Sequence, residues 1–244
     1  MTSLGLASSY AKQLGFSEVL IPDSLDGTRS SANWARPPGG FDRLNTRAVF
    51  PSSNEWDIPD LPRSDVRPTA LVPYHERQKI EKAPSGSAIH FFIDDYRFET
   101  IWTHPNRGLD RCARVGAALT PDFSMWRDMP LVMQLWQVYR SRWVGAWLLF
   151  NGIDVVPTVT WSTPKTFEFA FTGLARGSTV AISTVGVADK QAKSLFAAGC
   201  EALVEAVAPS CVLVYGKPEM VEPVLGGSDI ELRYYQTRWD TDGR

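Results

Sequence analysis

Six short runs of nearly continuous apolar residues place the strongest constraint on how this chain folds. They cover residues 88–94, 117–122, 153–161, 179–184, 211–216 and 230–235. A strand with one face in water shows strict alternation of apolar and polar residues, and these runs do not. Runs of this kind are typical of strands that are covered on both faces, as in parallel sheets.

Segments of helical length separate several of these runs. In the clearest, residues 129–150, apolar side chains recur at helical spacing: Val132, Leu135, Trp136, Tyr139 and Trp143. A second predicted helix covers residues 190–207. The alternation predicts an α/β fold of repeated strand-helix units with a mainly parallel sheet. We interpret the sheet as a partial or complete barrel-like arrangement, with an open sheet as the alternative. Pro157 predicts a bulge or a sheet edge in the third run.

The chain before these runs differs in composition. Residues 1–55 are rich in Ser, Gly, Pro, Asn and Arg, which predicts an extended N-terminal arm that is flexible or pinned to the surface. Residues 56–86 are punctuated by prolines and predict an extended strap across the domain. The α/β core then covers residues 87–238, and residues 239–244 form a C-terminal tail. Trp34 in the arm and Trp56 in the strap could anchor these segments to the core, or could bind a protein partner.

Charge and composition exclude several classes of protein. The chain has 25 Lys and Arg against 27 Asp and Glu, so any nucleic-acid contact is local rather than global. Its three cysteines lack CxxC spacing and indicate buried thiols in a reducing compartment. Neither a signal peptide nor an apolar stretch of about 18 residues is present. We expect a cytoplasmic protein that does not contact a membrane, and its oligomeric state stays open.

Polar side chains follow the apolar runs where the predicted strands end. Ligands of parallel α/β folds bind beyond these carboxyl ends, because loops and helix N-termini gather there. We therefore predict a site for a small molecule, or for a local nucleic-acid contact, at this edge. The side chains at the predicted strand ends are Asp94, Asp95, Asp122, Ser124, Trp161, Ser162, Ser183, Thr184, Tyr215 and Lys217.

Asp94, Asp95 and Asp122 are the candidate catalytic residues. Asp94 and Asp95 cannot both point into one site unless the strand ends between them, because side chains alternate along a strand. Asp94 and Asp122 could share a divalent cation such as magnesium, or divide the acid and base roles. The alternative is structural, since a carboxylate in this position also caps a following helix.

The remaining candidates would bind the substrate. Arg97, Arg140 and Lys217 would neutralise its negative charge, and Trp161 and Tyr215 would stack on a ring. Ser124 and Ser183 complete the predicted substrate-binding set. Packing is the alternative role for Trp161, and an outward position over a neighbouring tryptophan is the alternative for Arg140.

Familiar catalytic motifs are absent, because the sequence contains no GxxxxGK[ST], no GxGxxG after a strand, no HExxH and no GxSxG. His90 lies within an apolar run and is interpreted as a core histidine. After these exclusions, catalysis by carboxylate side chains is the class of chemistry that remains.

Several segments together resemble a known family. They are FFIDDYRFE (91–99), TPDFSMWRDMP (120–130), YRSRWVGAW (139–147), GIDVVPTVTW (152–161), STVGV (183–187) and LVYGK (213–217). In order and spacing they are similar to the domain of unknown function 4417 family, which is met in phages, plasmids and integrated elements of Gram-positive bacteria. The resemblance covers about residues 56–217 and implies a mobile-element setting in a bacterial host cell, without implying an activity. The departures, Thr120, Met125 and Trp126, leave every acidic position intact.

Two functional hypotheses follow. The first is an enzyme, such as a hydrolase that depends on carboxylates or a divalent metal, acting on a phosphate-bearing (nucleotide or nucleic acid) or glycosidic substrate. The second is a non-catalytic binding or assembly factor in phage or plasmid replication or in virion formation, which captures a protein partner through residues 1–55.

Overall fold

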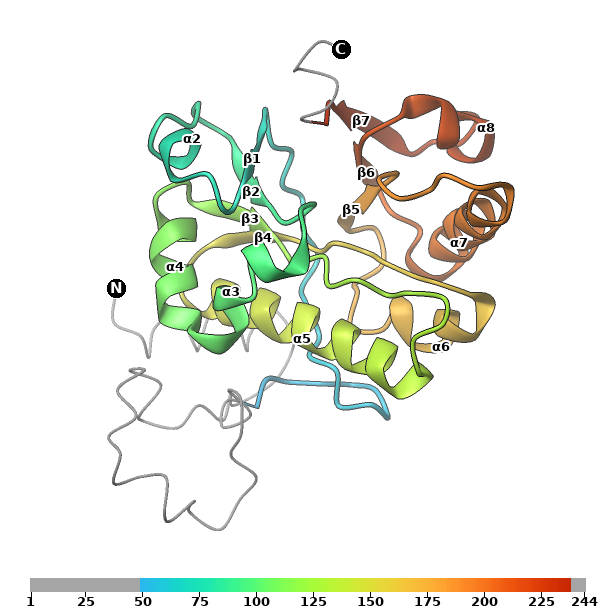
Figure 1. Ribbon diagram of the computed structural model, residues 1–244, viewed down its shortest axis with the longest axis horizontal. Helices are drawn as coiled ribbons and strands as arrows, with labels where there is room; N and C mark the ends of the chain where they lie inside the picture. Colours follow the sequence, from blue (N-terminus) through green and yellow to red (C-terminus); the bar gives the residue numbers. More distant parts are fainter. Residues whose placement is uncertain (1–48, 238–244) are drawn as a thin grey trace.

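The computed structural model describes residues 49–237 and arranges them as parallel sheets flanked by helices (Figure 1). One sheet has the order β1-β2-β3-β4, the other has the order β5-β6-β7, and every strand pair is parallel. The expected α/β fold is confirmed. The strands are β1 (Leu71–Pro73), β2 (Ala88–His90), β3 (Ala117–Leu119), β4 (Asp154–Val156), β5 (Thr179–Ser183), β6 (Cys211–Tyr215) and β7 (Glu231–Tyr235).

Helices follow most of the strands, and both predicted long helices are confirmed as α5 and α7. In Figure 1, α5 runs below the first sheet, and α7 and α8 flank the second. The helices are α2 (Arg77–Glu81), α3 (Thr100–Thr103), α4 (Pro105–Ala113), α5 (Leu131–Phe150), α6 (Phe167–Ala170), α7 (Lys190–Val207) and α8 (Glu222–Leu225). Short 3-10 turns lie at η2 (Asp95–Arg97), η3 (Pro164–Thr166) and η4 (Pro218–Met220).

A single parallel bridge joins the two sheets, between Thr158 and Ala181. Ala181 donates its N–H to Pro157 O (2.8 Å) and accepts from Val159 N–H (2.8 Å). The strands thus follow one another in chain order, as in a barrel. Within residues 49–237, however, no ladder joins β1 to β7. A complete barrel is therefore wrong, and the open-sheet alternative describes the arrangement.

Pro157 marks the point where the pairing of β3 with β4 shifts by one residue. The ladder pairs Leu119 with Val156. One step further, Thr120 contacts Thr158, because Thr158 N–H donates to Thr120 Oγ1 (2.9 Å) and Thr158 Oγ1 donates to Thr120 O (2.7 Å). One residue is thus inserted at Pro157, which has no N–H for the ladder. Pro157 directly follows β4, the edge strand of its sheet, and the predicted edge position is thereby confirmed.

The described core has four apolar clusters, the smallest of which contains Ile58, Val138 and Phe169. One lies between the first sheet and helices α3, α4 and α5, where Trp102, Trp143 and Phe98 are fully buried. A second lies between the second sheet and α7. The third is shared by both sheets and joins their facing side chains, including Phe92 and Tyr215. His90 lies beside this cluster, 4.7 Å from the Tyr215 ring, and burial lowers its pKa to about 3, so it is a neutral core histidine as predicted.

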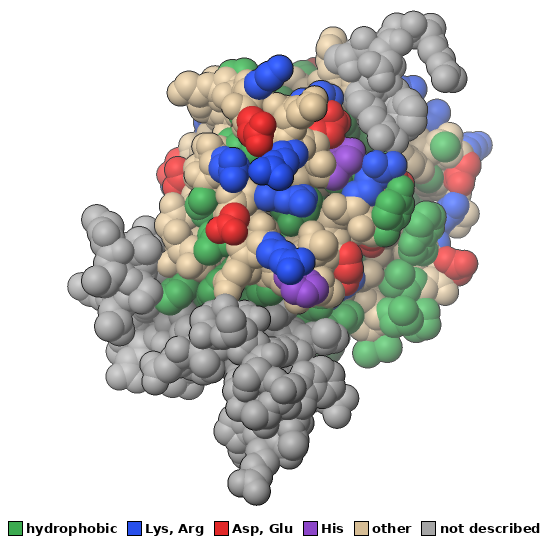
Figure 2. Space-filling model, turned by 60° about the vertical axis from the view of Figure 1, so that its left-hand side comes forward, with side chains coloured by type: hydrophobic (Ala, Val, Ile, Leu, Met, Phe, Trp, Pro, Cys, Tyr) green, Lys and Arg blue, Asp and Glu red, His purple; other side chains and the backbone are tan. Residues whose placement is uncertain are grey.

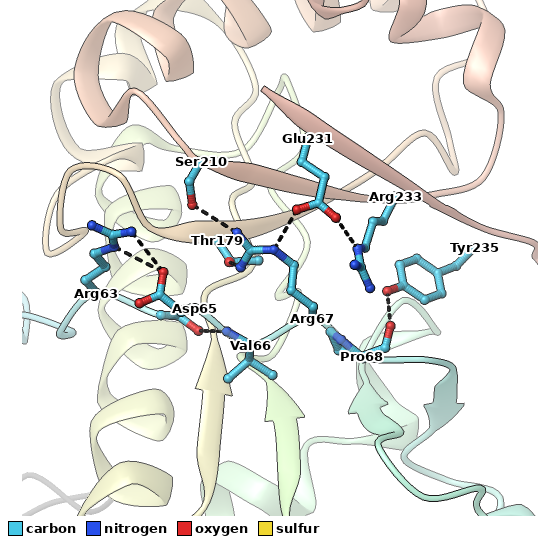
Figure 3. Close-up of polar contacts among 11 residues, drawn as sticks. Arg63, Asp65, Val66, Arg67, Pro68, Thr179, Ser210, Glu231, Arg233 and Tyr235 are labelled. Atoms are coloured by element: carbon cyan, nitrogen blue, oxygen red, sulfur yellow. Dashed lines mark hydrogen bonds and ion pairs between the residues drawn. The ribbon is translucent and has the colours of Figure 1, made fainter. Parts of the chain in front are cut away.

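An extended segment, residues 63–68, crosses the second sheet where its strands begin (Figure 3). It lies within the part of the chain that was expected to form a strap. The guanidinium group of Arg67 donates to a side chain at or beside the start of each strand, namely Thr179, Ser210 and Glu231. Tyr235 Oη, at the end of β7, donates to Pro68 O (2.6 Å). The segment thus connects the two sheet edges that no ladder joins. The arm, residues 1–48, and the tail, residues 238–244, lie outside the described residues.

The Arg142 side chain is fully buried in α5 and bonds only to backbone carbonyls among the described residues. It donates to the carbonyl oxygens of Thr158 (3.0 Å), Ala170 (2.9 Å) and Thr172 (3.2 Å). Burial lowers its pKa to about 9, which still leaves the guanidinium protonated at neutral pH. The side chain therefore ties α5 to the segment that connects the two sheets.

Replacing Arg142 by methionine tests this connection. Methionine fills similar space but leaves the three carbonyl groups of Thr158, Ala170 and Thr172 buried without a donor. Because each unsatisfied group costs about 1–3 kcal/mol, we expect a loss of roughly 3 kcal/mol or more in the free energy of unfolding, measured by urea denaturation. The exposed Arg114→Met is the control and should change it by less than about 0.5 kcal/mol. Equal effects of the two substitutions would contradict the assignment.

Candidate functional site

A pocket of about 340 Å³ lies beyond the carboxyl ends of β3, β4 and β5. Its walls are the loop after β3, the segment after β4, the loop after β5 and the first turns of α7. This is the edge at which the sequence predicted a site. Of the predicted residues, the pocket brings together Asp122, Ser124, Trp161 and Ser183.

Asp122 is the carboxylate in the pocket wall. Thr160 Oγ1 donates to its Oδ1 over 2.5 Å. Desolvation raises the pKa of Asp122 to about 7, an effect that the Thr160 hydrogen bond opposes and the charge of Asp95 reinforces. Near neutral pH the side chain therefore exists in both protonation states, as a general acid or base requires.

The register shift at Pro157 positions this pair. Thr120 faces Thr158, and two residues further along each chain Asp122 faces Thr160. Because side chains two residues apart lie on the same side of an extended chain, the same offset carries both contacts. Thr160 was not among the predicted site residues. The only sequence signal was its position after Pro157.

Asp94 and Asp95 do not join Asp122 in the pocket. Asp95 accepts hydrogen bonds from Ser124 N–H (3.1 Å) and Ser124 Oγ (2.8 Å), and so it holds the loop after β3 in place. Asp94 is exposed and pairs with Arg97 Nε (3.0 Å). Asp94, Asp95 and Asp122 thus lie in three different environments and do not form one cluster. Within residues 49–237, no group of three or more His, Cys, Asp or Glu side chains is arranged to hold a metal ion.

Arg140 lies outside the pocket, packed under the loop after β3. Its guanidinium lies 3.8 Å from the centre of the Phe123 ring, pairs with Glu99 Oε1 (2.7 Å) and donates to Gln137 Oε1. The outward position considered for Arg140 is wrong, because the side chain is buried. Gln137 in turn donates to Ser124 O (3.3 Å), so this network supports the loop that carries Asp122.

Trp161 forms a wall of the pocket and also packs in the core. Its Nε1 donates to Leu195 O (3.2 Å), and its ring contacts Phe196 (5.6 Å between centres). Ser183 also lines the pocket, where its Oγ accepts from Val185 N–H (3.1 Å). The position of Trp161 is therefore compatible with both roles, packing in the core and contact with a substrate.

Tyr215 and Lys217 lie elsewhere. Tyr215 points into the shared core, stacked on Phe92 with 5.0 Å between ring centres. Lys217 is exposed at the start of η4, where its N–H bonds to Thr184 Oγ1 (2.7 Å). Neither side chain lines the pocket.

Trp126 and Arg127 in the pocket wall were not predicted, whereas Ser162 was expected at a strand end without being named as a site residue. Ser162 Oγ is buried and has no hydrogen-bond partner among the described residues. Trp126 is 65% exposed at the pocket wall. Arg127 pairs with Asp189 (2.8 Å), the residue that caps α7. The described lining therefore contains no cation without a carboxylate partner.

Comparison with known families places these features in context. The family described as "Domain of unknown function (DUF4417)" matches residues 50–226, which include every strand except β7 and all of the pocket lining. The chain belongs to this family. The resemblance seen in the sequence motifs is thereby confirmed.

Relatives of the chain come from mycobacteriophages. It is 48% identical over 219 residues to the "Gene 1 protein" of Mycobacterium phage L5, covering 88% of this chain and 94% of the relative. It is 48% identical over 221 residues to the "Gene 1 protein" of Mycobacterium phage D29, covering 88% and 79%. No solved structure matches. Among residues 49–237, no helix is long and apolar enough to span a membrane.

The raised pKa of Asp122 makes the stability of the protein depend on pH. The ordinary carboxyl pKa is 3.8, whereas the folded protein keeps this proton to about pH 7. Between these values the folded state binds more protons, so the contribution of Asp122 to stability falls as the pH rises. The neutral Asp122→Asn side chain removes this dependence. In urea denaturation, we expect the variant to gain stability relative to the wild type from about pH 4 to about pH 7. A difference that does not change with pH would contradict the raised pKa.

Gly199 on α7 leaves the space that Trp161 occupies. A Cβ atom there would lie 1.9 Å from Trp161 Nε1, so Gly199→Ala must displace the indole ring that forms the pocket wall. We expect a loss of about 1–3 kcal/mol in the free energy of unfolding, measured by urea denaturation. Gly227→Ala is the matched control, because a Cβ atom at that position would meet nothing within 4 Å, and its effect should be below about 0.5 kcal/mol. A neutral Gly199→Ala would contradict the close contact.

Proposed function

We propose that the protein is an enzyme that cleaves the glycosidic bond of a small ring-bearing substrate of the nucleoside class, with Asp122 as the general acid. The proposal depends on one observation: the carboxyl group of Asp122, with a pKa raised to about 7, lies in the wall of a pocket at the strand ends. We further propose that it acts in the cytoplasm of a bacterial host, since its relatives are phage proteins.

The pocket supports a single small substrate rather than a polymer. Its volume of about 340 Å³ lies at the lower end of the range of about 300–1,000 Å³ for small-molecule sites. Trp161 and Trp126 offer aromatic surfaces on which a base or sugar ring could stack. Ser162 adds a hydroxyl group without a partner among the described residues.

The charges favour a glycosidic substrate over a polyphosphate. Phosphate groups are normally bound by arginine, lysine or a metal ion. In the described lining, Arg127 already pairs with Asp189. A neutral nucleoside or glycoside needs no such cation, and the cleavage of its glycosidic bond requires an acid with a raised pKa.

The chemistry assigned to Asp122 is a transfer of one proton in each direction. The protonated carboxyl gives its proton to the leaving base while the bond to the sugar carbon breaks. Thr160 Oγ1 donates to the carboxylate that forms, and so stabilises it. A water molecule then bonds to the sugar carbon and loses a proton to Asp122, which restores the acid. The products are the free base and the free sugar.

The test is hydrolysis of a panel of purine and pyrimidine nucleosides, followed by release of free base and reducing sugar. We expect Asp122→Asn to lower kcat by about 10²–10⁴-fold while the substrate still binds. The wild-type kcat/KM should fall above about pH 7, because the acid form of Asp122 is required. Asp94→Asn is the control: it removes the same charge outside the pocket and should leave kcat unchanged. Failure to hydrolyse any nucleoside, or equal loss in both variants, would contradict the proposal.

A binding or assembly factor is the second candidate, and one surface favours it. Large apolar side chains are exposed on the first turns of α5 and on the adjoining pocket loop: Leu131, Val132, Met133 and Trp136 on the helix, and Trp126 on the loop. Exposed apolar patches of this kind mark protein interaction sites. Complementation of phage growth separates the candidates. A binding factor would tolerate Asp122→Asn and lose function with Val132→Glu, whereas the enzyme would show the opposite pattern.

A further inference from the structure

Basic side chains gather on the face formed by α2 and α4, away from the pocket. Figure 2 shows Lys and Arg side chains grouped on this side of the molecule. Helix α4 and the residue after it contribute Arg107, Arg111 and Arg114, and Lys82 follows α2. We call these four residues the basic face.

The spacing on α4 places its arginines on one side of the helix. Residues three and four apart lie on the same face, and Arg107, Arg111 and Arg114 are separated by four and three. The opposite side of α4 is buried, where Gly108 packs against Ile101 and Cys112 is fully inaccessible. The arginines therefore project from a helix that the core holds in place.

Arg107 and Arg114 differ from the other arginines of the described chain. Elsewhere in residues 49–237, each arginine outside the basic face pairs with a carboxylate or donates to backbone carbonyls: Arg63, Arg67, Arg77, Arg97, Arg127, Arg140, Arg142, Arg176 and Arg233. Arg107 and Arg114 are exposed and make neither contact with any described residue, and Lys82 is likewise exposed without a described carboxylate partner. The exposed Asp110 lies on the same side of α4 but forms no ion pair with either arginine, so both guanidinium groups keep their donors for an external anion.

Arg111 and Tyr74 connect the two helices of this face. The Arg111 guanidinium lies 4.8 Å from the centre of the Tyr74 ring, and its Nη1 donates to Tyr74 O (3.4 Å). Tyr74 lies just before α2, and Ile80 of α2 is buried in the same apolar cluster as Cys112 of α4. The two sources of positive charge are thus fixed relative to each other, so an anion that spans them would bind a surface that is already organised.

We propose that the basic face binds the phosphate backbone of a nucleic acid. A planar guanidinium donates two parallel hydrogen bonds to a phosphate, and a row of such groups matches a polymer that carries a phosphate at every unit. The local concentration of positive charge on a chain of net charge −2 is the arrangement that phosphate contacts require.

The composition of the face argues against a membrane surface. Helices that lie on membranes combine basic residues with large apolar residues that enter the bilayer. None of the exposed large apolar side chains of the described chain lies on α2 or α4. Phosphate contacts to a nucleic acid require no such side chains.

The test is fluorescence anisotropy of the full chain with a labelled DNA duplex of random sequence, over a range of salt concentrations. Arg107→Gln combined with Arg114→Gln should weaken binding about tenfold or more at low salt. It should also reduce the slope of log K against log salt by about 2, since each phosphate contact contributes about 0.9. Lys165→Gln combined with Lys193→Gln removes the same charge from exposed positions elsewhere and should change neither quantity.

Two further measurements complete the experiment. Thermal denaturation should show that both double variants fold as the wild type does, because all four side chains are exposed. Lys82→Gln alone should give a smaller loss of DNA affinity. Unchanged DNA binding by the arginine variant, or an equal loss in the lysine control, would overturn the proposal. So would binding of anionic lipid vesicles or polyglutamate as tight as that of DNA through the same arginines. None of these outcomes depends on Asp122, so the two proposals stand or fall separately.

Discussion

The arrangement of the whole molecule depends on how two sheets are held together where almost no ladder joins them. One bridge connects Thr158 to Ala181. The rest of the connection consists of the apolar cluster shared by both sheets and of buried polar contacts. In these contacts the Arg142 guanidinium donates to Thr158 O, while Thr120 bonds to Thr158 and to Ser141 of α5. A buried charge is costly unless its donors are satisfied, and here three carbonyl groups satisfy it. Helix α5 therefore holds the segment between the sheets in one position.

That position also determines the geometry of the pocket wall. The inserted residue at Pro157 moves Thr158 to face Thr120 and Thr160 to face Asp122. Without the insertion, the side chains that follow β4 would meet β3 with a different offset. The position of the Asp122 carboxyl group in the pocket wall thus follows from the contacts that the segment after Pro157 makes with the segment after β3.

The sequence predicted the fold well, and the site only in part. The continuous apolar runs predicted the strands, because a strand covered on both faces needs apolar side chains on both sides. The helical spacing in residues 129–150 predicted α5. The run at residues 88–94 predicted a strand that ends at Asp94, but β2 ends at His90. The chain turns before the two acidic residues, so Asp94 pairs with Arg97 and Asp95 with Ser124. Contacts such as Asp122 with Thr160 join residues far apart in the sequence, and no local pattern records them.

The narrow connection between the sheets has a consequence for how the pocket keeps its shape. Asp122 lies after β3 of the first sheet, and Ser183 and the start of α7 lie in and after β5 of the second. Each sheet packs on its own helices in its own apolar cluster, and a further cluster is shared by the two sheets. The separation of the two pocket walls therefore depends on how the side chains of the shared cluster pack between the sheets. The dimensions of the cavity are thus set by the orientation of the two sheets, and the segment at residues 63–68 also restrains that orientation, through Arg67 at the start of β7 and Pro68 at its end.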